Sequence, residues 1–408
     1  MACESIYDAR LPINGRSIAL YKLAKWKNGM AFKKADFSST GLPIIKIAEL
    51  NGGISDSTAW TEGDYGKDVF LTKGDYVFSW SGNPETSIDI FRYNLQDGWL
   101  NQHIFKVTPE TSLVREEYFF FLMKWLKPVF KKIAANKQTT GLGHVTLADL
   151  KRIQVTIPSF EVQERIERIL CPLDFKIRLN NQLNDYLANL LDAAFANSAK
   201  SGSKEFGLPE VVDILSGGTP KTKNAEYWED GRIPFFTPGD VTNSVYTLTT
   251  EKHITDVGLD NCNSELYPVD TVFLTARGTV GKVAIAGRPM AMNQSCFAFR
   301  GKSIPQSVVF QIIKNAVKTL RAKANGATFA AINTRDLKIE TVAVPCNKEI
   351  AHYDESASKW LDLIRTNEEE NLQLSALRDI LLPKLMSGEI DVSKVDLTQL
   401  TNNHLADC

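Results

Sequence analysis

Two stretches of the chain repeat apolar residues at the three- and four-residue spacing of a helix that packs along one narrow seam. They cover residues 162–194 and 350–381. Each predicts a helix of about 35–40 residues, or roughly 50–60 Å. A helix with so narrow an apolar stripe needs a partner helix to cover it. Each stretch also carries an asparagine in the middle of the seam, Asn180 or Asn367. Because a polar seam residue fixes the register of a coiled coil, the pattern predicts that the two helices pair.

The alternative is that each helix lies on its own domain. Pro172 falls inside the first stretch, and a proline there removes a backbone hydrogen bond and bends the helix. We therefore expect a kink at Pro172 or a helix that starts after it.

The segments between these stretches alternate between strand and helix patterns. Residues 68–80 and 269–275 have the character of strands, whereas residues 113–132 and 307–324 have that of amphipathic helices. Glycine-rich turns separate them, and residues 200–204 are expected to form a linker. These segments are predicted to be mixed α/β domains.

The chain also repeats itself. The tripeptide Asp149-Leu150-Lys151 recurs as Asp336-Leu337-Lys338, 187 positions later, and the same offset relates Asn180 to Asn367. A weaker echo at an offset of 191 relates Glu49 to Asp240. The protein is therefore predicted to be one unit written twice, each unit a globular part followed by a helix.

These patterns together predict an α+β fold, with two mixed α/β domains separated by two long helices that form an antiparallel coiled coil. The expected boundaries are 1–155 for the first domain, 156–204 for the first helix and linker, 205–345 for the second domain, 346–390 for the second helix, and 391–408 for a tail.

Composition adds little to this division. The 408 residues carry a net charge of −1 and are 43% hydrophobic, which is ordinary for globular proteins. The acidic excess lies in residues 347–408, while residues 1–155 are mildly basic, which permits contact with DNA without predicting it. The six cysteines form no CxxC pair, and neither a membrane-spanning stretch nor a secretory signal is visible. We expect a cytoplasmic protein with reduced thiols.

A search for catalytic motifs finds none with the required spacing. Residues 278–282 resemble a phosphate loop, but only two residues separate the glycines and Val283 follows the lysine, so a strand-to-strand turn is the better interpretation. The five histidines have no partner at metal-ligand spacing. The tetrapeptide with which adenine methyltransferases grip an extruded base is also missing. We therefore expect a non-catalytic chain without a cofactor or a metal of its own.

Basic and amide side chains gather near the expected loops of both domains. Lysine and arginine neutralise phosphates, whereas arginine, asparagine and glutamine can also read base edges. Taken singly, each fits an ordinary solvated surface charge better than a DNA contact, but their recurrence at similar places in both units favours DNA contact. The candidate DNA-binding residues are Lys33, Lys34, Arg92, Tyr93, Lys137, Gln138, Thr140, Lys221, Lys223, Tyr227, Arg277, Thr279, Lys282 and Asn325.

Three segments resemble the specificity subunit of bacterial type I restriction–modification systems. Residues 215–220, Leu-Ser-Gly-Gly-Thr-Pro, look like the opening of that family's target-recognition domain. Residues 176–184 and 381–390 are similar to its central and distal helices. The resemblance spans residues 15–392, and the first unit departs from it where residues 27–30, Lys-Asn-Gly-Met, replace Gly-Gly-Thr-Pro.

The resemblance implies two target-recognition domains, each of which reads one half of a bipartite DNA sequence. It implies that the helices act as a spacer and dock two methylation subunits, through which restriction subunits join. Those partners would carry the chemistry of S-adenosylmethionine, ATP and Mg²⁺.

Two other functions compete with DNA recognition. A coiled-coil scaffold for protein interactions predicts no salt-dependent affinity for DNA. A cryptic enzyme acting on nucleic acid predicts turnover by the isolated chain.

Overall fold

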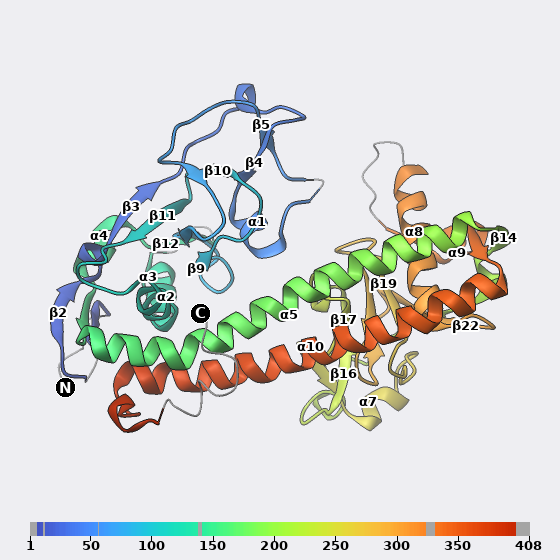
Figure 1. The fold of residues 1–408 in the computed structure, drawn as a ribbon. Helices are drawn as coiled ribbons and strands as arrows, with labels where there is room; N and C mark the ends of the chain where they lie inside the picture. Colours follow the sequence, from blue (N-terminus) through green and yellow to red (C-terminus); the bar gives the residue numbers. More distant parts are fainter. Residues whose placement is uncertain (1–5, 11–12, 56, 138–140, 324–330, 397–408) are drawn as a thin grey trace. The chain divides into compact units, whose positions relative to one another are not determined.

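The computed structural model describes residues 6–10, 13–55, 57–137, 141–323 and 331–396 (Figure 1). The chain divides into two compact units. Unit 1 comprises Met1–Phe175 with Leu374–Cys408, and unit 2 comprises Lys176–Gln373. Each unit therefore contains one globular part together with a portion of both long helices.

The two long helices are α5 (Phe160–Lys200) and α10 (Asn347–Ser387), with 41 residues each. At 1.5 Å per residue, each is about 62 Å long. Helix α5 continues through Pro172, so the expectation of a helix that starts after the proline is wrong. One lost hydrogen bond is tolerated because the preceding turns are anchored by Ile166 and Leu170, which are fully buried in the core of unit 1.

The two helices pair in antiparallel fashion within each unit. In unit 1, Arg378 Nη1 donates to Asp174 Oδ1 at 2.9 Å. In unit 2, the rings of Phe195 and Tyr353 lie 5.4 Å apart. Since residue numbers fall along α10 as they rise along α5, the predicted antiparallel pairing is confirmed.

The mid-seam asparagines form a symmetric set of four. Asn180 Nδ2 donates to Asn371 Oδ1 at 3.0 Å, and Asn367 Nδ2 donates to Asn184 Oδ1 at 2.8 Å. The repeat offset of 187 relates Asn180 to Asn367 and Asn184 to Asn371, so each pair joins one asparagine of each helix and the repeat exchanges the two pairs. The helix pair in unit 2 therefore has a local two-fold symmetry, with hydrogen-bonded amides on both sides of its centre.

The main sheets of the two units share the order of four strands, to which unit 2 adds a fifth, β17. In unit 1 the order is β3-β11-β7-β9, and in unit 2 it is β15-β22-β19-β20-β17. The strands of unit 1 are β3 (Ala24–Asn28), β11 (Ile104–Pro109), β7 (Tyr76–Ser79) and β9 (Asp89–Arg92). Those of unit 2 are β15 (Val212–Ser216), β22 (Cys296–Gly301), β19 (Val272–Thr275), β20 (Val283–Ala286) and β17 (Tyr246–Thr247).

A second sheet in each unit contains an equivalent parallel pair, β4 with β10 and β16 with β21. In unit 1 its strands are β4 (Leu42–Ile45), β5 (Trp60–Thr61), β6 (Phe70–Leu71) and β10 (Gly98–Leu100). In unit 2 they are β16 (Ile233–Phe236), β18 (Lys252–Ile254) and β21 (Ala291–Met292). The duplication predicted from the helices therefore extends to the globular parts.

A third, small sheet precedes each long helix. It is formed by β1 (Asp8–Ala9), β2 (Arg16–Ala19) and β13 (Gln154–Ile157) in unit 1, and by β14 (Ser203–Gly207) and β23 (Thr341–Pro345) in unit 2. Since β14 begins at Ser203, the linker expected at 200–204 is shorter than predicted. A two-stranded pair, β8 (Ser81–Gly82) with β12 (Gly143–His144), completes unit 1.

Short helices cover the sheets. Unit 1 has α1 (Ile47–Gly52), α2 (Glu116–Trp125), α3 (Lys127–Asn136), α4 (Leu147–Arg152) and the 3₁₀ turns η1 (Leu20–Leu23), η2 (Lys34–Asp36) and η5 (Val392–Lys394). Unit 2 has α6 (Leu208–Val211), α7 (Asp256–Asp260), α8 (Gln306–Lys323), α9 (Thr334–Ile339), η3 (Ala225–Tyr227) and η4 (Pro238–Asp240).

Two predicted elements are divided in the structure. The helix expected at 113–132 is interrupted at Leu126, because Pro128 favours the first turn of a new helix. The strand expected at 68–80 consists of β6 and β7, separated by a turn in which Gly74 has a φ of +98°. Both breaks occur at residues whose backbone preference overrides the apolar pattern.

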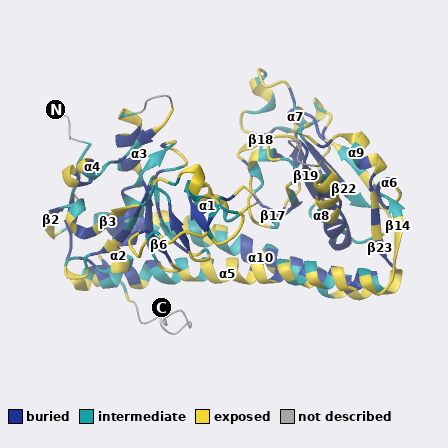
Figure 2. Cartoon of the chain, turned by 90° about the horizontal axis from the view of Figure 1, so that it is seen from above, coloured by how far each residue is buried: buried dark blue, intermediate teal, exposed yellow. Residues whose placement is uncertain are grey.

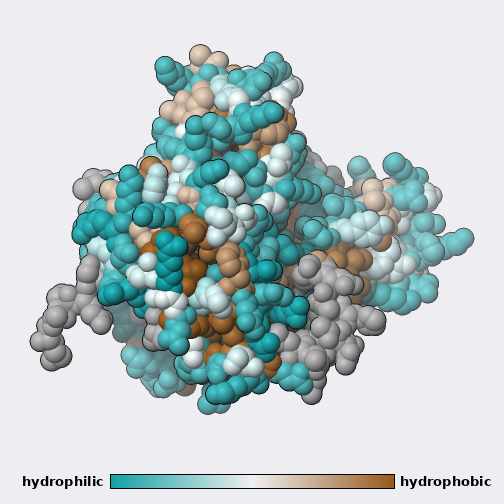
Figure 3. Space-filling model, turned by 60° about the vertical axis from the view of Figure 1, so that its left-hand side comes forward, coloured by the Kyte–Doolittle hydropathy of each residue, from teal (hydrophilic) through white to brown (hydrophobic). Residues whose placement is uncertain are grey.

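Each unit has its own hydrophobic core, to which both long helices contribute. The unit 1 core includes Ile166 and Leu170 of α5 with Leu385 and Met386 of α10. Buried and exposed residues alternate along both helices (Figure 2). Apolar side chains also reach the surface in groups among polar ones (Figure 3). None of the described helices is both long and apolar enough to cross a membrane.

Candidate nucleic-acid interface

Four loops of unit 2 meet beside its two sheets. They are residues 217–223, 237–240, 276–282 and 293–295, which we call the second loop cluster. Ala276 N donates to Ser295 O at 2.8 Å, and Thr279 Oγ1 donates to Pro238 O at 2.9 Å. A Cβ on Gly217 would lie 2.2 Å from Asn293 O, so only glycine permits this approach. The loops are thus held together by backbone contacts and by the Thr279 hydroxyl, while the exposed basic side chains remain available for a ligand.

The turn between β19 and β20 is held both by its own backbone and by a neighbouring helix. Gly281 N donates to Thr275 O at 2.8 Å, and Arg321 Nη2 of α8 donates to Val280 O at 2.9 Å. The antiparallel pairing of β19 with β20 confirms the strand-to-strand turn predicted here. Arg277, Thr279 and Lys282 are exposed on it. A basic and polar edge is therefore presented on a rigid support.

The loop that follows β15 contributes the other predicted residues of unit 2. Lys221 and Lys223 are exposed, while Tyr227 is half-buried in η3. Trp228 Nε1 donates to Lys221 O at 3.3 Å and so restrains the loop. Two lysine side chains therefore extend into solvent from a restrained backbone.

Unit 1 contains an equivalent first loop cluster, formed by residues 29–36, 46–52, 80–82 and 101–103. Trp80 N donates to His103 O at 3.3 Å, as Ala276 N does to Ser295 O in unit 2. Lys33 and Lys34 are exposed in this cluster. The two units therefore assemble their loops in the same way.

The departure at residues 27–30 leaves the backbone of the first cluster unchanged. Gly29 approaches Asn101 O as Gly217 approaches Asn293 O. Met30 N donates to Leu100 O at 2.8 Å, and Gly218 N donates to Met292 O at 3.1 Å. One glycine at the point of close approach is enough to preserve the geometry.

The weak alignment of Glu49 with Asp240 reflects a shared turn. Glu49 Oε2 accepts Lys46 N at 3.0 Å, and Asp240 Oδ2 accepts Thr237 N at 2.7 Å. Each carboxylate closes the first turn that follows its parallel strand. Both carboxylates therefore support the loops of their clusters.

Two predicted residues of unit 1 are placed elsewhere. Arg92 forms an ion pair with Glu117, and its guanidinium lies 4.6 Å from the centroid of the Phe120 ring. Tyr93 is 1% exposed, and its hydroxyl donates to Gln96 O. We correct the assignment of both, because an engaged arginine and a buried tyrosine hold the core together and do not present a surface to DNA.

Lys137 also has an internal partner. Its ammonium donates to both carboxylate oxygens of Asp149, which is 1% exposed. Burial raises the pKa of Asp149, but hydrogen bonds from Lys137, Thr146 and Tyr7 outweigh it and hold that pKa below its ordinary value. Lys137 is therefore an anchor of α4. The predicted residues Gln138, Thr140 and Asn325 lie outside the described part of the chain.

The candidate list omitted two glutamines. Gln102 and Gln294 occupy equivalent positions in the two loop clusters, and Gln294 is exposed while Gln102 is half-buried. Each follows an asparagine at the end of a parallel strand, β10 or β21. The recurrence of Asn-Gln in both halves is the signal that would have found them.

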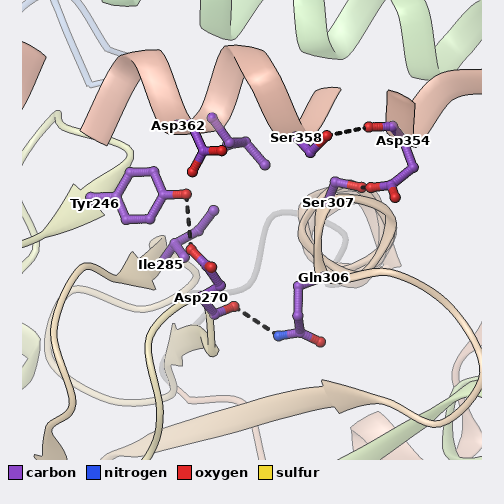
Figure 4. A pocket seen from close by; sticks show the side chains of 9 residues that line it. Tyr246, Asp270, Ile285, Gln306, Ser307, Asp354, Ser358 and Asp362 are labelled. Carbon is purple, nitrogen blue, oxygen red and sulfur yellow. Dashed lines mark hydrogen bonds between the residues drawn. The ribbon is translucent and has the colours of Figure 1, made fainter. Parts of the chain in front are cut away.

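A pocket of about 200 Å³ lies in unit 2 at the side of α10 (Figure 4). Its polar groups bond to one another, since Tyr246 Oη donates to Asp270 Oδ1 at 3.1 Å and Ser307 Oγ donates to Asp354 Oδ1 at 2.5 Å. Small-molecule sites usually measure about 300–1,000 Å³. This pocket is therefore part of the joint between α10 and its domain. The described residues contain no group of three or more His, Cys, Asp or Glu side chains placed to hold a metal ion.

Comparison with known proteins identifies the repeated unit. The family model for the type I restriction modification DNA specificity domain matches twice, at residues 17–189 and 200–373. The HindI specificity subunit of Haemophilus influenzae is 23% identical over 407 residues, covering 78% of this chain and 87% of that protein. The MjaIX specificity subunit of Methanocaldococcus jannaschii is 30% identical over 172 residues, or 40% of this chain and 39% of that one.

A solved structure has the same fold over nearly the whole chain. The S subunit of a type I restriction–modification system from M. genitalium superposes with a TM-score of 0.52 at 14% identity. The match covers 92% of this chain and 98% of that one.

Proposed function

The chain belongs to the family of type I restriction modification DNA specificity domains, and we propose on this premise that each of its two domains reads one half of a bipartite DNA target. It is a DNA target-recognition subunit, whose relatives are named specificity subunits and not catalytic ones. The family assignment does not favour the alternative of a scaffold without sequence-specific DNA binding.

One observation carries the proposal, namely that the two loop clusters share a backbone and differ in side chains. Gly29 and Gly217 make the same close approach, and the loops are joined by matching hydrogen bonds. The residues after these glycines are Met-Ala-Phe-Lys-Lys in unit 1 and Gly-Thr-Pro-Lys-Thr-Lys in unit 2. Because a shared loop backbone carries different side chains in the two units, the two half-sites should differ in sequence. We therefore expect an asymmetric target.

The proposed contacts are divided by chemistry. Lysine and arginine at the cluster edges would neutralise phosphates, and Arg277 on its rigid turn would read a guanine edge. The proposed set is Lys33 and Lys34 in unit 1 and Lys221, Lys223, Tyr227, Arg277, Thr279 and Lys282 in unit 2. Gln138, Thr140 and Asn325 are retained as proposals from the sequence alone.

The two long helices would set the distance between the half-sites. We propose the domain boundaries given above, 1–155, 156–204, 205–345, 346–390 and 391–408, with the helical segments as spacer. Half-sites read by such a pair are expected about one duplex turn, roughly 34 Å, apart. Lengthening α5 and α10 equally should change the spacer length and leave both half-sites unaltered. An unchanged spacer length would rule out the proposal that the helices set the distance between the half-sites.

The helices would also dock two methylation subunits, with restriction subunits joining through them. Exposed apolar residues such as Leu179, Leu183 and Tyr186 on α5 support a protein partner on this surface. Those partners would bring S-adenosylmethionine, ATP and Mg²⁺. Because the chain acts on DNA, we propose a cytoplasmic location.

The test is single-molecule methylation mapping of DNA from cells that express this chain with its methylation partner. We expect a bipartite, adenine-methylated motif that disappears when this chain is deleted. Arg277→Ala should relax or abolish one half-site only.

Arg288→Ala is the matched control, because Arg288 is also an exposed arginine but lies beyond the opposite end of β20. Absence of a motif that depends on this chain, with a folded and active partner, would contradict the proposed function. DNA affinity that does not fall with salt would favour the scaffold instead.

A further inference from the structure

Gln102 and Gln294 are fixed in space by the same backbone contacts. Asn101 N donates to Ile45 O at 3.0 Å, and Asn293 N donates to Phe236 O at 2.9 Å. On the other side of each glutamine, His103 O and Ser295 O accept the equivalent bonds described above. The two side chains therefore leave equivalent points of the two loop clusters.

The fold explains the shared asparagine better than the shared glutamine. Asn293 Oδ1 accepts Ser295 N at 3.0 Å, a local turn that favours asparagine. The glutamine amides, by contrast, have different neighbours. Gln102 Nε2 lies 3.2 Å from His103 Nε2, whereas Gln294 Oε1 accepts from Thr219 Oγ1. Among the described residues, the two glutamine side chains thus share no contact that would require glutamine at both places.

The surroundings of the two glutamines have also diverged. Trp80 in unit 1 occupies the position of Ala276 in unit 2, because the backbone amides of both donate to the residue that follows the glutamine, His103 or Ser295. Met30 likewise replaces Gly218. Glutamine persists on an otherwise altered surface that, under the proposed function, faces DNA.

We propose that Gln102 and Gln294 read the same base, an adenine, at symmetry-related positions of the two half-sites. A glutamine amide combines an acceptor with a donor, which matches N6–H and N7 of adenine in the major groove. Thr219 leaves one lone pair of Gln294 Oε1 for the N6–H. This inference rests on the proposed function and adds that two otherwise different half-sites share one element.

The experiment compares the wild-type chain, Gln294→Ala and Gln102→Ala, each purified with the methylation partner. Competition binding uses the mapped target and duplexes with every single base-pair substitution. We expect Gln294→Ala to reduce discrimination about 5- to 150-fold at one A·T pair of one half-site. Gln102→Ala should do so at one A·T pair of the other half-site, at the same distance from the spacer.

Two further variants separate reading from folding. Gln294→Glu keeps the shape and the acceptor but loses the donor, so it should lose discrimination at the same base pair while retaining the wild-type thermal unfolding midpoint. Gln96→Ala removes an exposed glutamine of unit 1 outside the loop cluster and should leave every position unchanged.

Three outcomes would overturn the proposal. They are unchanged discrimination, an affinity that falls equally for all duplexes as for a phosphate contact, and relaxed positions that are not related by symmetry. A wild-type complex that shows no preferred sequence would contradict the proposed function itself, and this inference with it.

Discussion

The paired asparagines at the centre of the helix seam are expected to be energetically coupled. Asn184 and Asn367 are 8% and 5% exposed, and one amide donates to the other at 2.8 Å. Replacing either residue alone by leucine leaves a buried amide group without its partner. The expected cost is about 1–3 kcal/mol of local stability.

Replacing both asparagines removes the unsatisfied group. The double variant Asn184→Leu/Asn367→Leu should therefore return to within about 1 kcal/mol of the wild type, because apolar pairs pack well along a seam. The resulting coupling free energy is about 1–3 kcal/mol, since the effects of contacting residues do not add. The double variant no longer has the constraint that the buried asparagines place on the register of the two helices.

Hydrogen exchange of the backbone amides of α5 near residue 184 measures the local opening free energy, from which the coupling is calculated. The cycle consists of the wild type, both single variants and the double variant. The cycle at Asn180 and Asn371, the pair related by the repeat offset, should give a similar coupling. Asn189→Leu, at an exposed position of the same helix, is the control and should cost little. Additive opening free energies in both cycles would refute the reasoning.

Three other perturbations test contacts of the long helices with their domains and one close approach within a loop cluster. Burial raises the pKa of Glu368 to about 8, although the amides of Val245 and Tyr246 oppose the shift. The folded state then holds an extra proton, so the free energy of unfolding should fall as the pH rises from about 4.5 to about 8; in Glu368→Gln, titration by denaturant at each pH should show this slope reduced. Gly217→Ala would place a Cβ 2.2 Å from Asn293 O, and methylation mapping should show damage to one half-site while the other is retained. Glu167 accepts Arg115 Nε at 2.5 Å and Tyr118 N at 2.9 Å, so Glu167→Ala should cost about 2 kcal/mol in denaturant unfolding; an unchanged midpoint would contradict this anchoring role.

Much of the fold was predictable because its signals are local. A 3–4 residue period defines a helix wherever the chain lies, and the offset of 187 exposes the duplication without any structure. The predicted turn at 278–282 follows from glycines that adopt φ values of +78° and +79°. Helix length could thus be argued from residues near one another in sequence, and helix pairing from the repeat.

The candidate site was less predictable, because a basic side chain looks alike in sequence whether it faces water or a carboxylate. Arg92 pairs with Glu117, which lies 25 positions away, and Lys137 pairs with the buried Asp149. Only three-dimensional packing separates these anchors from exposed residues such as Arg277. Gln102 and Gln294 can be aligned in the sequence at an offset of 192, but they were not selected, since an uncharged residue gives no charge signal.

The sequence by itself determined that the protein has two similar units and two long helices, because periodicity and repetition are properties of the chain. Tertiary structure alone decided which loops meet. Gly217 and Asn293 are 76 positions apart, yet a close approach between them joins residues 217–223 to residues 293–295. Such proximity depends on the order and direction of strands in a sheet, which hydrogen bonds between distant segments establish.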